Sequence, residues 1–305
     1  MQRRRLGPSE LHVSRLSLGS WRTFERIDRS GGLAVMQAAR EHGINFLDDA
    51  RYDDETARAP IPTGYSEVVF GELFRAAGWD RADTVVANKL WWEFWPEQTA
   101  QKELEASLGR MGFDYVDLIY ANPPPDGMPV RDVVAAIGEL LRAGLARAWG
   151  IVNWEAEQFL AASRAAAEHG LPQPCAAQLP YSLVRRDWVE STAMGEALAA
   201  SGAGVVASFA IAGGVLTGKY DAGGTGRSRE ELDDPRLADA RETGRRLRAL
   251  GEDLGVSPAA LAIGFALANP AVVSVLFGAT SPAQVTENAR ALELDAGVLE
   301  RLRAF

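Results

Sequence analysis

Short apolar runs and amphipathic segments alternate along the whole chain. Eight of the runs are almost continuously apolar, which is typical of strands buried on both faces. The predicted strands are 14–18, 44–47, 84–88, 115–121, 146–152, 175–179, 204–208 and 272–277. Between them, apolar side chains recur at helical spacing, as in segment 133–141. The pattern therefore predicts repeated strand–helix units.

Eight such units favour one closed fold. Parallel strands joined by helices are covered on both faces, and eight units close into a barrel. Ser257 and Ser281 each precede a proline, a pair typical of helix starts. We therefore expect residues 1–305 to form a single α/β domain, a (β/α)8 TIM barrel. A two-domain dinucleotide-binding fold is the main alternative, but no G-x-G-x-x-G follows a strand.

Two segments depart from this alternation. Gly7, Pro8 and Ser9 form a turn signal between two short β-like runs ahead of the first barrel strand. We expect an N-terminal β-hairpin that closes the bottom of the barrel. After the seventh strand, residues 221–235 are rich in glycine and charge, which predicts a long loop.

Charge and cysteine content narrow the classes of partner. The formal net charge is -9, so no basic surface attracts a nucleic acid or an anionic membrane. We expect neither a nucleic-acid partner nor membrane insertion, because no apolar stretch reaches about 18 residues and no signal-peptide pattern follows the basic start. Cys175 is the only cysteine, which favours a cytoplasmic protein without disulfides or a cysteine-based metal site. No metal is expected.

The chemistry of such a barrel is expected at the carboxyl ends of its strands, where the active sites of this fold lie. Polar side chains gather at these positions. The residues at the strand ends are Ser20, Trp21, Asp48, Lys89, Asn122, Asn153, Gln178, Ser208 and Gly278.

Lys89 follows four apolar residues of a buried strand. A buried ammonium needs a charged partner, and Asp48 on the neighbouring strand is the nearest candidate. The pair is either a structural salt bridge or part of an active site, since both arrangements perturb pKa values.

A tyrosine beside this pair would decide between the two interpretations. Of the six tyrosines, Tyr52 and Tyr65 lie between Asp48 and the next helix. A nearby ammonium is expected to lower the pKa of a phenol. Such a phenol can protonate a carbonyl oxygen while a hydride reaches the carbon. Lys89 could instead form a Schiff base, as in barrel aldolases.

Several motifs in register resemble the aldo-keto reductases over nearly the whole chain. They are GINFLDDA, SEVVFGELF, VVANK, DYVDLIYAN, RAWGIVNW, AAQLPYSLVRR, AIAGGVLTGKY and SVLFGATSPAQVTENARAL. The resemblance implies a (β/α)8 enzyme that uses NADPH to reduce carbonyl groups, with a tetrad of Asp, Tyr, Lys and His. Asp48 and Lys89 match the first and third of these positions.

The histidine position of the tetrad is Asn122 here, and the three histidines of the chain lie elsewhere. An asparagine at this position resembles the potassium-channel β subunits and their bacterial relatives. An amide can orient a carbonyl oxygen but cannot relay a proton at physiological pH. The resemblance thus implies a slow reductase or, as the alternative, a nucleotide-binding regulatory or sensor protein with low turnover. Asn122 could also be a simple turn residue.

The tyrosine is displaced as well. In the family it lies five residues after the aspartate, a position held here by Asp53. Tyr52 is one residue early and is the expected proton donor, with Tyr65 as the alternative beyond the extra residues 54–64. Asp49 stands where the family has threonine, so we expect it at the cofactor rim or in solvent.

The resemblance also implies NADP as the cofactor. Gln178 and Asn153 match contacts to the nicotinamide amide, although Val152 replaces a serine that precedes Asn153 in relatives. Arg229 matches a contact to the 2'-phosphate, which favours NADP over NAD. The other implied cofactor positions are Ser20, Trp21, Ser208, Phe209, Ala210, Gly213, Lys219, Gly278, Thr280, Gln284, Glu287 and Asn288.

Some of these positions also have simpler explanations. Ser208 stands where many relatives have a stacking aromatic ring, so Phe209 would have to supply it. Ser281 and Gln284 match a helix capping box. The aromatic run 90–95, with Trp21 and Trp154, would line the mouth and favour an apolar or aromatic carbonyl substrate, unless the rings pack between loops. A homo-oligomer is left open.

Overall fold

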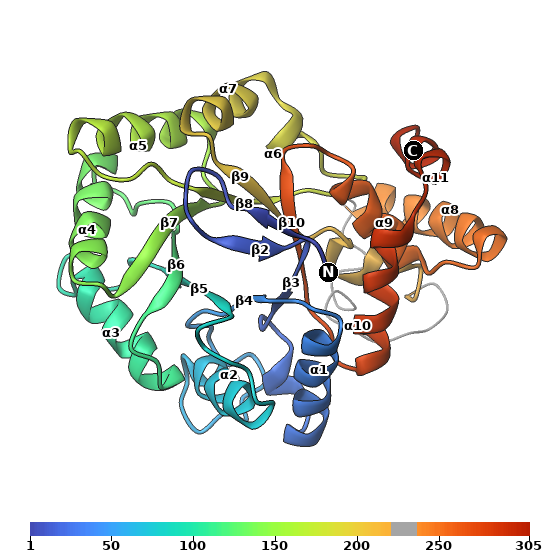
Figure 1. Ribbon diagram of the computed structural model, residues 1–305, viewed down its shortest axis with the longest axis horizontal. Coiled ribbons are helices and arrows are strands. Elements are labelled where there is room, and N and C mark those ends of the chain that lie inside the picture. The colour runs from blue at the N-terminus through green and yellow to red at the C-terminus, as the bar shows by residue number, and fades with distance from the viewer. Residues whose placement is uncertain (221–236) are drawn as a thin grey trace.

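A closed parallel barrel forms the centre of the molecule in the computed structural model, which describes residues 1–220 and 237–305 (Figure 1). Within these residues the strands close in the order β10-β3-β4-β5-β6-β7-β8-β9. They are β3 (Leu16–Gly19), β4 (Phe46–Asp48), β5 (Val85–Leu90), β6 (Val116–Ala121), β7 (Ala146–Val152), β8 (Ala176–Pro180), β9 (Gly204–Ser208) and β10 (Val272–Phe277). The predicted (β/α)8 barrel is confirmed. The loop expected at 221–235 lies outside the described residues.

Helices surround the barrel and cover its outer face (Figure 1). They are α1 (Arg29–Glu41), α2 (Tyr65–Ala76), α3 (Ala100–Met111), α4 (Val130–Arg142), α5 (Ala156–Glu168), α6 (Asp187–Glu190), α7 (Thr192–Ser201), α8 (Ala238–Leu254), α9 (Pro258–Leu267), α10 (Pro282–Ala289) and α11 (Ala296–Arg303), with 3-10 helices η1 (Phe24–Arg26), η2 (Ala212–Thr217) and η4 (Arg290–Glu293). Ser257 and Ser281 cap α9 and α10 as predicted, since their hydroxyls accept hydrogen bonds from backbone N–H groups of the first turns.

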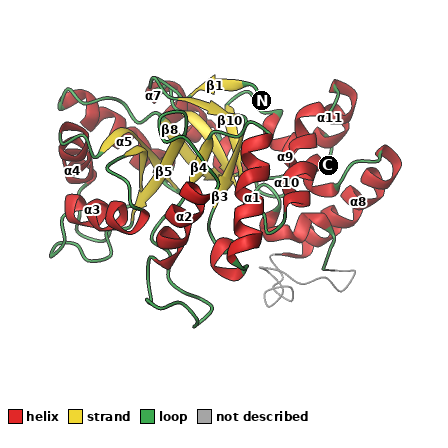
Figure 2. Cartoon of the chain, turned by 60° about the horizontal axis from the view of Figure 1, so that its bottom comes forward, coloured by secondary structure: helices red, strands yellow, loops and turns green. Residues whose placement is uncertain are grey.

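The predicted N-terminal hairpin is present. β1 (Arg3–Arg5) and β2 (His12–Ser14) pair antiparallel. Leu6 and Val13 of the hairpin belong to the same buried cluster as Phe46 and Val85, which point into the barrel. The hairpin therefore closes one end, and the loop that leads into α2 extends from the other (Figure 2).

The period-2 alternation of each strand positions the chemistry. In β5, Val85 and Ala87 face the inner cluster, whereas Val86 and Leu90 face the helices. Lys89 has the parity of the inward residues, so it points into the barrel near its carboxyl end. The same argument places Asp48 after Phe46.

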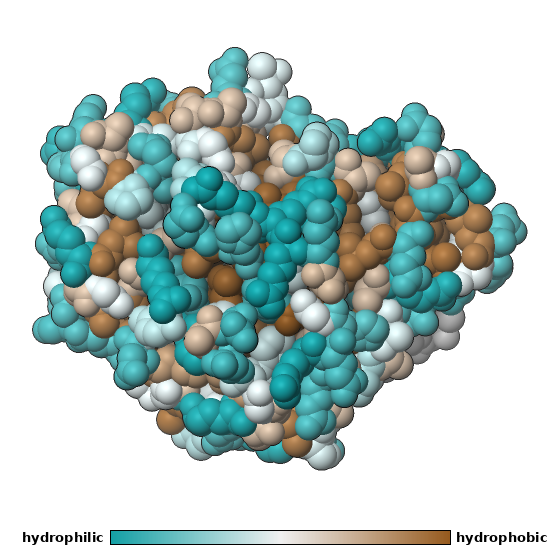
Figure 3. Space-filling model, in the orientation of Figure 1, coloured by the Kyte–Doolittle hydropathy of each residue, from teal (hydrophilic) through white to brown (hydrophobic). Residues whose placement is uncertain are grey.

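The outer surface is mixed in hydropathy. Hydrophilic side chains cover much of the hairpin face, with scattered apolar ones (Figure 3). Across 1–220 and 237–305, no single helix is long and apolar enough to cross a membrane. Only α8 and α9 together meet that test, and they are bent by 101° relative to one another.

Candidate active site

A cavity of about 800 Å3 opens at the carboxyl end of the barrel. Most of the predicted site residues line it. They are Trp21, Asp48, Tyr52, Lys89, Asn122, Asn153, Gln178, Ser208, Phe209, Ala210, Gly213, Lys219, Gly278, Thr280, Gln284 and Asn288. The topology thus brings together side chains from widely separated parts of the chain.

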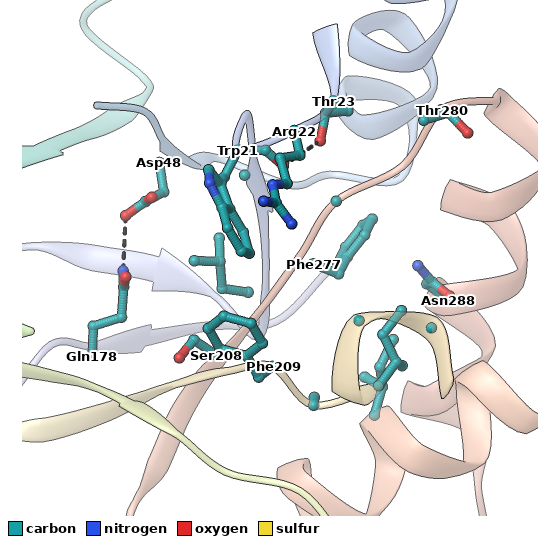
Figure 4. A pocket seen from close by; sticks show the side chains of 18 of the residues that line it. Trp21, Arg22, Thr23, Asp48, Gln178, Ser208, Phe209, Phe277, Thr280 and Asn288 are labelled. Atoms are coloured by element: carbon teal, nitrogen blue, oxygen red, sulfur yellow. Dashed lines mark hydrogen bonds between the residues drawn. The ribbon is translucent and has the colours of Figure 1, made fainter. Parts of the chain in front are cut away.

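Lys89 lies at the centre of the polar end of this cavity. Its ammonium donates to Asp48 Oδ1 in a close ion pair, and to Tyr52 Oη at 3.2 Å. Gln178 Nε2 donates to the other carboxylate oxygen of Asp48 at 2.8 Å (Figure 4). The buried carboxylate is therefore held on both oxygens, which offsets the cost of removing its charge from water.

Tyr65 occupies a different place. It is the first residue of α2, and its hydroxyl accepts a hydrogen bond from Arg29 at 3.1 Å. The Arg29 guanidinium carbon lies 5.6 Å from the centre of its ring. Tyr65 does not line the main cavity, so the phenol beside Lys89 is that of Tyr52.

The pKa values in the site differ from the expectation that an ammonium lowers the pKa of the phenol. Burial raises the pKa of Tyr52 above its ordinary value, and the opposing effect of the Lys89 ammonium is smaller. Burial alone would lower the pKa of Lys89, but Asp48 and Tyr52 together raise it. The phenol therefore stays protonated and the lysine stays charged near neutral pH.

Asn122 lines the cavity but part of its amide is already engaged. Its Nδ2 donates to the carbonyl oxygen of Leu90 at 3.0 Å, and its backbone N–H donates to the same oxygen at 3.0 Å. An amide nitrogen has two N–H groups, so one remains for a ligand in the cavity. Asn122 thus combines the role of a strand-end residue with a place in the site.

Asp49 differs from its expected position. Its side chain is fully buried rather than at the rim or in solvent, and Ser20 Oγ donates to its Oδ1 in a short hydrogen bond. Burial, followed by the charge of Glu67, raises the pKa of Asp49 well above its ordinary value. Ser20 is itself buried and is not among the residues that line the cavity, in contrast to the prediction.

The far end of the cavity is formed by the start of α10. Thr280, Gln284 and Asn288 line it. Ser281 Oγ accepts from the backbone N–H of Gln284 at 3.4 Å, which is one half of the predicted capping box. The Gln284 side chain accepts from the backbone N–H of Thr280 at 2.8 Å instead of that of Ser281. Glu287 was predicted here too, but it does not line the cavity, and its carboxylate lies 3.7 Å from Arg290 on the same helix. Arg229 lies outside the described residues.

Aromatic rings form the mouth. Trp21 lies edge-to-face against Phe209 with ring centres 5.5 Å apart, and Tyr52 lies against Trp91 at 6.0 Å. Phe209 is 40% exposed and has a positive φ of 55°. Two other tryptophans do not line the mouth. Trp92 and Trp154 are buried in the hydrophobic core, and each donates to a backbone carbonyl.

The cavity also contains residues that the sequence reasoning missed. Arg22 and Arg26 line it, Arg22 beside Trp21, and Phe277 lies at the end of β10 (Figure 4). The arginines could have been noticed, because both follow the first predicted strand in the segment that carries Trp21. Gly213 and Gly214 have positive φ, and a Cβ at Gly214 would lie 3.0 Å from Lys219 Nζ. Here the backbone itself forms the cavity wall.

Comparison with known proteins agrees with this geometry. The sequence profile of the Aldo/keto reductase family matches residues 15–305. A protein of Oryza sativa subsp. japonica described as a probable voltage-gated potassium channel subunit beta is 34% identical over 310 residues, 96% of this chain and 92% of its own length. A protein of Arabidopsis thaliana with the same description is 32% identical, with the same coverage.

Proposed function

Since the chain belongs to the aldo/keto reductase family, we propose that it is an NADPH-dependent oxidoreductase that reduces an aldehyde or a ketone to an alcohol. Family membership confirms the resemblance inferred from the motifs. The observation that carries the proposal is the contact of Lys89 with both Asp48 and Tyr52 inside the cavity. A structural salt bridge alone would not require a phenol at this point.

The cavity has the features that a dinucleotide needs. Gln178 and Asn153 line it, as do Thr280, Gln284 and Asn288 at the start of α10 and the glycines Gly213 and Gly214. The N-terminus of a helix favours a phosphate, because its N–H groups and dipole point outward. When bound, NADPH supplies the hydride that the carbonyl carbon receives.

The proton for the carbonyl oxygen comes from Tyr52. Its raised pKa keeps the proton on the phenol until the oxygen gains negative charge. The Lys89 ammonium at 3.2 Å then stabilises the phenolate that is left, and Asp48 holds the ammonium in place. The phenolate recovers its proton from solvent. The free N–H of Asn122 can hold the carbonyl oxygen of the substrate, but it has no proton to release.

The substrate is proposed to be an apolar or aromatic carbonyl compound. Trp21, Trp91 and Phe209 present rings to the mouth of the cavity, and such rings favour flat or apolar groups. Small hydrophilic aldehydes would leave these rings in water.

The test mixes the purified protein with NADPH and a panel of aldehydes and ketones, and follows the absorbance of NADPH. We expect turnover, with aromatic carbonyls giving higher kcat/KM than short aliphatic ones. A protein that binds NADPH but oxidises none of it across the panel would overturn the reductase proposal.

A second candidate is a nucleotide-binding regulatory or sensor subunit with low turnover. The description of the rice and Arabidopsis relatives as channel subunits favours it, and so does the amide at Asn122. The same experiment separates the two candidates, because tight binding without turnover is the result expected of a subunit.

A further inference from the structure

Arg22 has an unusual backbone conformation. Its φ is 53°, in the left-handed region that residues with a Cβ rarely adopt. Asn153 and Phe209, which also line the cavity, share this property. Strain of this kind persists where the surroundings hold it, and it concentrates at ligand sites.

The side chain of Arg22 extends into the middle of the cavity. Figure 4 shows it between Trp21 and Phe277, with Asp48 and Gln178 on one side and Thr280 and Asn288 on the other. Its guanidinium carbon lies 4.9 Å from the centre of the Trp21 ring. The ring thus fixes the guanidinium between the two ends of the site.

Glu55 is the carboxylate that pairs with Arg22, and it comes from the extra residues that precede α2. Arg22 Nε forms a close ion pair with Glu55 Oε2. Arg26 Nη2 contacts the same oxygen at 2.8 Å. One partly exposed carboxylate oxygen of Glu55 therefore forms ion pairs with two arginines. An ion pair that is exposed to water contributes little free energy.

We propose that Arg22 binds the diphosphate of the dinucleotide and leaves Glu55 when it does so. This inference rests on the proposed function. The diphosphate joins the two nucleosides, so it must lie between the nicotinamide end and the adenosine end, where Arg22 lies (Figure 4). A guanidinium binds two phosphate oxygens through parallel N–H groups, and this contact replaces the shared carboxylate. Glu55 then acts as a competitor that weakens nucleotide binding.

The experiment measures NADP+ binding by isothermal titration calorimetry. In the Arg22→Gly variant, glycine accepts the positive φ and the guanidinium is lost. We expect the dissociation constant for NADP+ to rise roughly 10- to 100-fold. The constant for adenosine 2'-monophosphate, which has no diphosphate, should change by less than about twofold. The Arg29→Gln variant is the matched control, since it removes a neighbouring arginine that pairs with Glu72 outside the cavity.

The Glu55→Gln variant tests the competition. It keeps the shape of the side chain but frees Arg22, so NADP+ should bind several-fold more tightly. In the double variant with Arg22→Gly this gain should disappear, because the two residues act on one another.

The outcomes of these binding measurements distinguish a failure of the proposed function from a failure of the role proposed for Arg22. Failure of the wild-type protein to bind NADP+ contradicts the proposed function itself. Binding by the wild type with unchanged affinity in Arg22→Gly contradicts only the role of Arg22, and would assign the guanidinium to another anion such as a substrate carboxylate. A gain from Glu55→Gln that persists without Arg22 would contradict the competition at Arg22, and would assign the effect to Arg26 or to direct repulsion of the nucleotide by Glu55.

Discussion

At the scale of single residues, Tyr52 carries the chemical prediction. Replacing it with phenylalanine removes the proton donor but keeps the ring that packs against Trp91. We expect the Tyr52→Phe variant to lose at least about 100-fold in kcat for carbonyl reduction, with little change in the dissociation constant of NADPH. Steady-state kinetics and calorimetry measure the two quantities.

Tyr65→Phe is the control for this prediction, since its hydroxyl bonds to Arg29 instead of Lys89. It should retain nearly full activity. The reverse pattern, with Tyr65→Phe inactive and Tyr52→Phe active, would show that the wrong phenol has been assigned.

Asp49 gives a prediction on pH and stability. Its pKa is raised in the folded protein, so above the unfolded value near 4 the unfolded chain loses a proton that the folded chain keeps. Stability then falls as pH rises towards the folded pKa. The Asp49→Asn variant has no such proton, and between pH 5 and 8 it should gain on the wild type by up to about 1.4 kcal/mol per pH unit. Urea unfolding at several pH values measures this.

Asp54 is the control for the pH dependence that is predicted for Asp49. Hydrogen bonds, first from Thr56, lower its pKa to about 2, so its contribution to stability is lost only as pH falls towards that value. Asp54→Asn should therefore differ from the wild type by a constant amount between pH 5 and 8. A similar constant offset for Asp49→Asn would show that Asp49 ionises normally.

At the scale of elements, two glycines in adjacent helices predict opposite effects. A Cβ at Gly71 in α2 would lie 2.0 Å from the backbone oxygen of Met111 in α3. Gly71→Ala must push the helices apart and should cost about 1–3 kcal/mol. Gly109 in α3 has open space around it, so Gly109→Ala should stabilise by about 0.5–1 kcal/mol through helix propensity.

Chemical denaturation of both variants checks this pair. The sign is the informative result, because both changes add one methyl group to a helical glycine. Equal effects would mean that the α2–α3 contact yields without cost.

The strands show how far the sequence alone could predict the elements. β7, β9 and β10 have the predicted bounds, because most of their side chains are apolar and buried. The first predicted strand, 14–18, merged the end of β2 with β3, which starts at Leu16. Apolar pattern does not show which neighbour accepts the backbone hydrogen bonds, and here Ser14 pairs with the hairpin.

The site could be predicted to a similar extent. Asp48 and Lys89 follow from strand parity and the cost of burying a charge. Arg22 could have been noticed from its place after the first predicted strand, but the ion pair of Arg22 and the burial of Asp49 do not follow from the sequence, because both depend on distant partners. Glu55 reaches Arg22 only through the excursion before α2, and Ser20 reaches Asp49 only through strand pairing of β3 with β4.

At the scale of the whole molecule, the cavity predicts that cofactor binding stabilises the fold. Its walls come from β3 through β10 and from α10, so a dinucleotide would connect both ends of the chain. At a concentration of 100 times its dissociation constant, NADP+ should stabilise the protein by about 2.7 kcal/mol. Thermal unfolding with and without the nucleotide measures this.

NAD+ at the same concentration is the control. We expect a smaller shift of the unfolding temperature, since the predicted contact to the 2'-phosphate would be missing. Equal shifts with the two nucleotides would contradict the preference for NADP.

The excursion before α2 is closed on itself. Asp53 pairs with Thr63 across its base, Asp54 N–H donates to the Pro62 carbonyl at 2.8 Å, and the N–H of Gly64 donates to the Tyr52 carbonyl at 2.8 Å. Its ends therefore meet without help from its tip, and loops of this kind tolerate changes of length at small entropic cost. The segment starts directly after Tyr52, and hydrogen bonds within the segment hold its two ends together. A change in the length or charge of this segment, Glu55 included, should therefore change the proposed binding of the nucleotide without altering a barrel residue.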